Sequence, residues 1–126
     1  MELTDFYRNT SFDERYDENS FIGILLDYLK WDDEEYWKLD ANLQQILKLN
    51  SDKKFISQEI MEGIFSICND IFLTGNWSDI KIHKGNSVKK CKLNIYDRFR
   101  RLKTLLVSAA YGDKSFFKID FVYKNS

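Results

Sequence analysis

Apolar residues recur at spacings of three and four over much of the chain, the pattern of helices that bury one face. The first such stretch, NSFIGILLDYLKW, has Ser20 as an N-cap and Gly23 inside it, where glycine costs about 1 kcal/mol relative to alanine. A second runs from about 34 to 49 and carries Tyr36, Leu39, Leu43, Ile46 and Leu47. The segment before Ser20 is polar, and we expect it to be loosely ordered.

A third stretch, SQEIMEGIFSICNDIFLTGN, predicts the clearest helix, with Ser57 as its N-cap and Gly75 at its end. It carries two adjacent apolar stripes: Ile60, Ile64, Ile67 and Ile71, then Met61, Phe65, Cys68 and Phe72. A double stripe is typical of a wide buried face. We therefore expect the 57–74 helix to be central in the core.

The periodicity shortens after Gly75. Segments 78–83 and 88–93 alternate weakly around the turn residues KGNS and predict a hairpin, although a helix that starts at Val88 also fits the spacing. We favour the hairpin. Asn94, with Asp97 three residues later, predicts a capped helix that Gly112 ends. Residues 115–123 predict a strand with Phe117, Ile119, Phe121 and Tyr123 on one face.

These elements predict an α+β fold: about four helices with a small antiparallel sheet from the C-terminal half. The 126 residues contain no proline, and hydrophobic residues make up 44% of them. This composition and length suit one domain, 1–126, with its own core.

Net charge is −1, but the charges are unevenly distributed along the chain. Residues 1–63 hold 15 acidic and 7 basic residues, a net charge of −8, whereas residues 64–126 hold 5 and 12, a net charge of +7. Such asymmetry indicates a charged partner, unless the fold brings the two halves together so that their charges cancel.

Few residues could support catalysis or bind a cofactor. His83 is the sole histidine, and the two cysteines, Cys68 and Cys91, are expected to be buried free thiols. The carboxylates lack the spacing of a calcium loop, and no glycine-rich phosphate loop is present. We therefore expect no enzyme activity, no metal and no cofactor. The opening MELTDFYRNT resembles no secretory leader, which favours a cytoplasmic protein without membrane contact.

The motif WDDEEYW, residues 31–37, places four carboxylates among three aromatic rings. Asp32 or Asp33 can cap the second helix, and acids in a first turn are stabilised by the helix dipole. Acids beside aromatic side chains also suit a protein interface, since charge steers association and aromatic residues anchor it. Our hypothesis is that the motif does both, with partner contacts from Asp33, Glu34, Glu35 and Trp37.

The alternative binding site is the basic stretch VKKCKLNIYDRFRRLK, with Lys89, Lys90, Arg98 and Arg101 as its contact residues. Basic residues interleaved with aromatics suit phosphate contacts, so the alternative function is a small nucleic-acid-binding regulator. The overall pI of about 5.8 argues against it, and nucleic acid is the less favoured partner.

The N-terminal third of the chain resembles the immunity protein 41 family of bacterial toxin-immunity systems. The residues that carry the resemblance are FYRN, SFIG and WDDEEYWKLD. The resemblance implies a small cytoplasmic protein that binds and neutralises a cognate toxin domain delivered by a neighbouring bacterium, as in contact-dependent growth inhibition. Toxins of such systems include nucleases, whose basic clefts an acidic surface could occupy.

Overall fold

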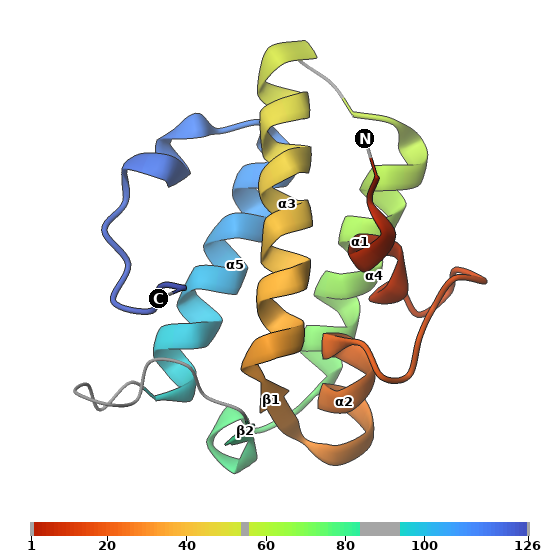
Figure 1. Cartoon of the computed structure of the whole chain (residues 1–126), viewed down its shortest axis with the longest axis vertical. Coiled ribbons are helices and arrows are strands. Elements are labelled where there is room, and N and C mark those ends of the chain that lie inside the picture. Colours follow the sequence, from red (N-terminus) through yellow and green to blue (C-terminus); the bar gives the residue numbers. More distant parts are fainter. Residues whose placement is uncertain (1, 54–55, 84–93, 126) are drawn as a thin grey trace.

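The computed structural model of the chain describes residues 2–53, 56–83 and 94–125, and over these ranges it is mostly helical. The elements in chain order are the helices and strands α1 (Thr4–Arg8), α2 (Phe21–Tyr28), β1 (Lys30–Asp32), α3 (Asp33–Lys53), α4 (Gln58–Leu73), η1 (Trp77–Asp79), β2 (Lys81–His83), α5 (Ile95–Tyr111) and η2 (Lys114–Lys118), where η marks a short 3₁₀ turn. The long helix α3 runs through the middle of the molecule, with α5 on one side of it and α1 and α4 on the other (Figure 1).

The central helix is α3, so the prediction that 57–74 is central was wrong. The apolar side chains of α3 are fully buried, namely Tyr36, Leu39, Leu43, Ile46 and Leu47. In α4 only the first stripe is buried (Ile60, Ile64, Ile67 and Ile71), whereas Phe65, Cys68 and Phe72 of the second are exposed. A helix at the edge of the bundle needs only one buried stripe, because a single neighbouring layer covers it.

The helix starts agree with the local sequence signals. The hydroxyl of Ser20 accepts from the Gly23 amide, and that of Ser57 accepts from the Ile60 amide. At α5, Asn94 and Asp97 form the expected capping box, and Gly112 ends the helix at a φ of 71°. Each signal lies within four residues of the groups it satisfies, which is why it could be recognised without tertiary information.

Within the part of the chain that the structure describes, the sheet has two strands, and they are parallel, so the predicted antiparallel sheet was wrong. Strand β2 lies within the expected 78–83 segment but pairs with β1, in a register that places Trp31 opposite Ile82. Leu29 takes a left-handed conformation, with φ 53°, and this ends α2 before Trp31, so that Lys30–Asp32 can extend. The expected strand 88–93, and the choice between hairpin and longer helix, lie outside the described residues.

The expected strand at 115–123 was also wrong. Its first residues form η2, and the rest of the segment is irregular. Phe116, Phe121 and Tyr123 are buried, whereas Phe117 and Ile119 are 42% and 38% exposed. Alternating apolar residues make a strand only where a neighbouring strand can pair with their backbone; here the segment packs its rings against α3 and α5 instead.

Residues 2–19 are held by polar contacts, contrary to our expectation of a loose segment. Phe6 is fully buried, and its amide donates to Asn42 Oδ1 of α3 at 2.8 Å. The Asn9 side chain accepts from the Ile22 amide, also at 2.8 Å, which joins the segment to the start of α2. Asparagine side chains thereby satisfy backbone groups that lie far away in sequence.

Candidate functional site

The motif WDDEEYW is divided between the core and the surface. Trp31 is fully buried, with its ring 4.6 Å from that of Phe21. Asp32 caps α3, because its Oδ1 accepts from the Glu35 amide at 3.1 Å. The hypothesis that the motif starts a helix is therefore confirmed, with Asp32 as the capping residue.

Asp33 forms a fully buried ion pair with Arg98 of α5. Nε and Nη2 of Arg98 donate to the two Asp33 oxygens at 3.0 and 2.8 Å, and both side chains are 0% exposed. The Tyr123 hydroxyl donates to Asp33 Oδ1 at 2.5 Å, and the Arg98 guanidinium lies 4.6 Å from the Tyr123 ring centre. Burial, helped by the hydrogen bond to Asp33, raises the pKa of Tyr123 far above its usual value.

A second buried acid–arginine pair lies two helical turns further along α3. Nε and Nη2 of Arg101 donate to Asp40 at 2.8 and 3.2 Å, and the Tyr36 hydroxyl donates to Asp40 Oδ2 at 2.7 Å. The Arg101 guanidinium lies 5.0 Å from the Trp37 ring centre. Each buried charge thus has an opposite charge and an aromatic neighbour, as a buried ion pair requires.

These two pairs join the acidic half of the sequence to the basic half. Asp33 and Asp40 belong to residues 1–63, whereas Arg98 and Arg101 belong to residues 64–126. The fold therefore neutralises part of the charge asymmetry along the chain. Arg98 is fully buried and Arg101 is 9% exposed, so neither presents a cation to phosphate in this structure. Lys89 and Lys90, the other residues of the alternative site, lie outside the described residues.

The surface part of the motif consists of Glu34, Glu35 and Trp37. Glu34 is exposed, whereas Glu35 accepts from Arg8 Nη1 at 3.1 Å and from Lys38 Nζ at 2.7 Å. Trp37 is half-buried. Asp33, the fourth residue of the hypothesis, lies beneath this surface and contributes to it only by holding α3 against α5.

Trp37 separates two shallow hollows. One, of about 300 Å³, is lined by Trp37, Asp40, Ala41, Gln44, Arg101, Lys124 and Asn125; the other, of about 310 Å³, is lined by Asp33, Glu34, Trp37, Lys38 and Asn125. We call these side chains together the Trp37 surface. Its charges are mixed, because Glu34 is accompanied by Lys38 and Lys124.

Among the residues of the Trp37 surface that the sequence hypothesis missed are Ala41, Gln44 and Asn125. The first two could have been found, since Glu34, Trp37, Ala41 and Gln44 follow one another at spacings of three and four on one helix face. Asn125 could not, because only the fold brings the C-terminal segment to α3.

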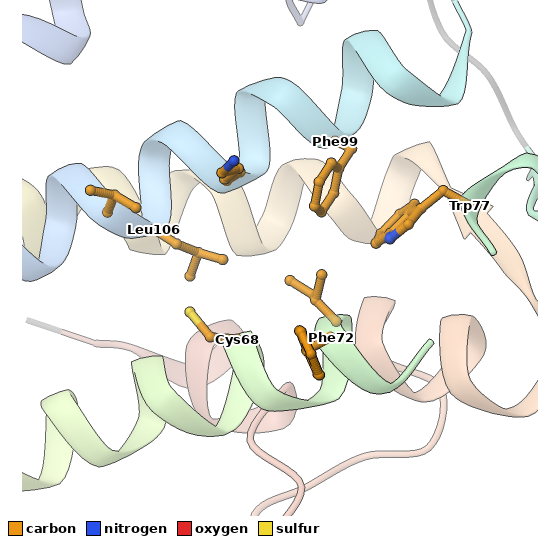
Figure 2. A pocket seen from close by; sticks show the side chains of 8 residues that line it. Cys68, Phe72, Trp77, Phe99 and Leu106 are labelled. Carbon is orange, nitrogen blue, oxygen red and sulfur yellow. The ribbon is translucent and has the colours of Figure 1, made fainter. Parts of the chain in front are cut away.

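A second surface lies between α4 and α5. Figure 2 shows Cys68 and Phe72 of α4 facing Phe99 and Leu106 of α5, with Trp77 at one end. This hollow, of about 260 Å³, adjoins a second of about 260 Å³ that shares its Cys68, Leu106 and Val107. We call the two together the α4/α5 groove.

Cys68 was expected to be buried, and this was wrong: its side chain is exposed, although desolvation in the groove raises its pKa. Cys91 lies outside the described residues.

Comparison with protein-family models finds a match to the model described as Immunity protein 41, over residues 8–122. The chain belongs to the immunity protein 41 family. The match covers most of the chain, far beyond the N-terminal motifs on which the resemblance rested, and it confirms that resemblance. Immunity families are in general not enzymes, and the family implies a toxin protein as the binding partner. Comparisons with curated proteins and with solved structures found no match.

Within 2–53, 56–83 and 94–125, no group of three or more His, Cys, Asp or Glu side chains is placed to hold a metal ion. Over the same ranges, no helix has the length and apolar character needed to cross a membrane.

Proposed function

We propose that this protein is an immunity protein that neutralises a cognate toxin domain by stoichiometric binding, without catalysis. The toxin domain would be delivered by a neighbouring bacterium, as in contact-dependent growth inhibition, and would be met in the cytoplasm. The observation that carries the proposal is the match to the immunity protein 41 family over residues 8–122.

The contact surface in this proposal is the Trp37 surface. Glu34 and Trp37 make direct contacts, whereas Asp33 and Glu35 act beneath them by fixing the first turns of α3. A half-buried tryptophan between two hollows suits an interface anchor, because its ring is already held rigid and loses little conformational entropy on binding. The ion pair of Asp33 with Arg98 and that of Asp40 with Arg101 support the helix from within.

A nuclease is our hypothesis for the toxin's activity. Clefts that bind nucleic acid carry Lys and Arg for the phosphates, and the exposed Glu34 carboxylate is complementary to such a surface. Asp33 is buried and Glu35 is largely buried, whereas Glu34 is exposed, so we expect Glu34 to be the acid of the motif that faces the toxin.

The test is co-expression of this chain with the C-terminal domain of the large protein encoded beside it. We expect rescue of growth and a purified complex with one copy of this chain for each toxin domain. Glu34→Lys should weaken the complex, and Asp52→Lys is the matched control: it makes the same change in charge near the opposite end of α3, about 27 Å away along the helix.

Two results would contradict the proposal. One is failure of the wild-type chain to rescue growth or to bind the toxin domain, accompanied by salt-dependent binding of DNA or RNA, which would favour the regulator function instead. The other would contradict only the choice of contact surface. If Glu34→Lys and Asp52→Lys reduce the rescue of growth equally, the toxin binds elsewhere on the protein.

A further inference from the structure

The outer stripe of α4 is the most exposed apolar feature among the described residues. Phe65, Phe72 and Leu73 are 63%, 85% and 67% exposed, and across the groove Val107 and Tyr111 of α5 are 50% and 83% exposed. Single exposed apolar side chains are ordinary, but a contiguous set of this kind usually marks an interaction surface.

The two helices run in opposite directions along the α4/α5 groove. Met61 and Phe65, near the start of α4, lie with Ala110 and Tyr111 at the end of α5, whereas Ile71 and Phe72 lie with Phe99. The rings of Trp77 and Phe99, 4.2 Å apart between their centres, close one end. The groove is therefore a continuous apolar strip with firm walls, already formed in the single chain.

The exposed area suits a protein partner of substantial size. At about 200 Å² for each aromatic side chain, the exposed parts of Phe65, Phe72 and Tyr111 alone amount to about 460 Å². A standard stable interface takes about 800 Å² from each partner. The aromatic residues thus supply more than half of one side of a dimer interface, before Leu73, Val107 and the groove walls are added.

Charge contributes little to this face. Among the acids of α4, Glu59 is paired with Arg15 and Asp70 is buried, whereas Glu62 is exposed. Glu62 follows Met61 at the Tyr111 end of the groove, and Lys103 lies with Ile71 and Phe99 toward the other end. The face is therefore mainly apolar, and a second copy offers the same apolar strip to cover it.

We infer that two copies of this chain associate through their α4/α5 grooves. A two-fold axis parallel to the groove lays α4 of each copy over α5 of the other, so that the aromatic strips meet. A closed two-fold dimer also buries the whole face in one step and leaves no apolar strip for further association. The toxin-binding Trp37 surface is separate from this interface, and the dimer does not depend on the toxin.

The test is the mass of the purified wild-type chain, by light scattering after size exclusion and by sedimentation equilibrium across the micromolar range. We expect a dimer. Phe65→Glu should raise its dissociation constant by about 30-fold or more, the factor for loss of an interface hot spot of about 2 kcal/mol. Phe12→Glu is the matched control, because Phe12 is 62% exposed and lies outside the groove, and it should leave the dissociation constant unchanged.

A wild-type chain that is monomeric throughout the range overturns the inference. If that monomer also loses toxin binding through Phe65→Glu, the groove is where the toxin docks. If Phe65→Glu and Phe12→Glu raise the dissociation constant of the dimer equally, the interface does not lie in the groove.

Discussion

Asp33 and Arg98 lie 65 residues apart in the chain and meet in a fully buried pair in which Arg98 donates two hydrogen bonds to the Asp33 carboxylate. The carboxylate belongs to the motif that most suggests a binding surface, yet its partner is the molecule's own α5. The pair fixes the start of α3 against the start of α5, and Tyr123 adds the C-terminal segment to the same cluster.

The first prediction concerns this pair. Asp33→Asn should lower the free energy of unfolding by about 3–5 kcal/mol, because it leaves the Arg98 charge buried without a full partner. Arg98→Met should cost a similar amount. The double variant should lose less than the two single losses combined, by about 2 kcal/mol, in urea unfolding experiments. Losses that simply add would mean that the two side chains act independently.

The two glutamates of the motif should differ in their effect on stability. Glu35→Gln weakens ion pairs to Arg8 and Lys38 and should cost about 1 kcal/mol, after allowance for the partial exposure of these side chains. Glu34→Gln, on the exposed side of the same turn, should cost only a few tenths. Melting temperatures of the two single variants provide the measurement. An equal loss in both would contradict a structural role particular to Glu35.

The association rate with the toxin should depend more on Glu34 than on Glu35, the reverse of the order expected for stability. Glu34→Gln should slow association roughly twofold at low salt, whereas Glu35→Gln should change it less, since Glu34 is exposed and the Glu35 side chain is only 16% exposed. The difference should vanish at high salt, where surface charges are screened. Stopped-flow mixing at two salt concentrations is the measurement, and equal rates at low salt for all three proteins would remove Glu34 from the contact surface.

Gly23→Ala should destabilise the protein, although alanine is the better helix former. An added Cβ would lie 2.3 Å from the backbone oxygen of Glu18, in the segment that precedes α2, and that backbone cannot move without disturbing the turn. Strain of this kind costs about 1–3 kcal/mol and should outweigh the gain of about 1 kcal/mol in helix propensity. A raised melting temperature would show that the segment before Ser20 yields easily. Asn69→Ala, at an exposed site of α4, is the control and should be close to neutral.

Stability should fall with alkaline pH through the buried tyrosines. Burial raises the pKa of Tyr123 and that of Tyr36 above the usual 10.0, so both phenols stay neutral in the folded state while they ionise in the unfolded chain. Their contribution to stability is complete below about pH 10 and is lost as the pH rises above it toward the folded-state pKa. Between about pH 9 and about pH 11, the free energy of unfolding of Tyr123→Phe should decline less steeply than that of the wild type. Parallel curves would contradict the raised pKa.

The sequence by itself determined where α2, α4 and α5 begin. Ser20, Ser57 and the Asn94–Asp97 capping box were recognisable because a cap and the backbone groups it satisfies lie within one turn. It also placed the apolar face of α3 correctly, since a spacing of three and four encodes a helix face directly. The family, too, was recognisable from motifs in the N-terminal third, and the family match over most of the chain confirmed it.

Only the tertiary structure decided which apolar stripes are buried and which charges are neutralised. The second stripe of α4 is as apolar as the first, and nothing within α4 shows that α5 stops short of covering Phe65 and Phe72. Among the described residues, no strand lies beside the alternating segment 115–123, and whether two segments become neighbours depends on the chain topology and not on their own sequences. Asp33 was recognisable as an acid at a helix start, but its burial followed from the approach of Arg98, a contact that depends on how α3 and α5 pack and not on any local pattern.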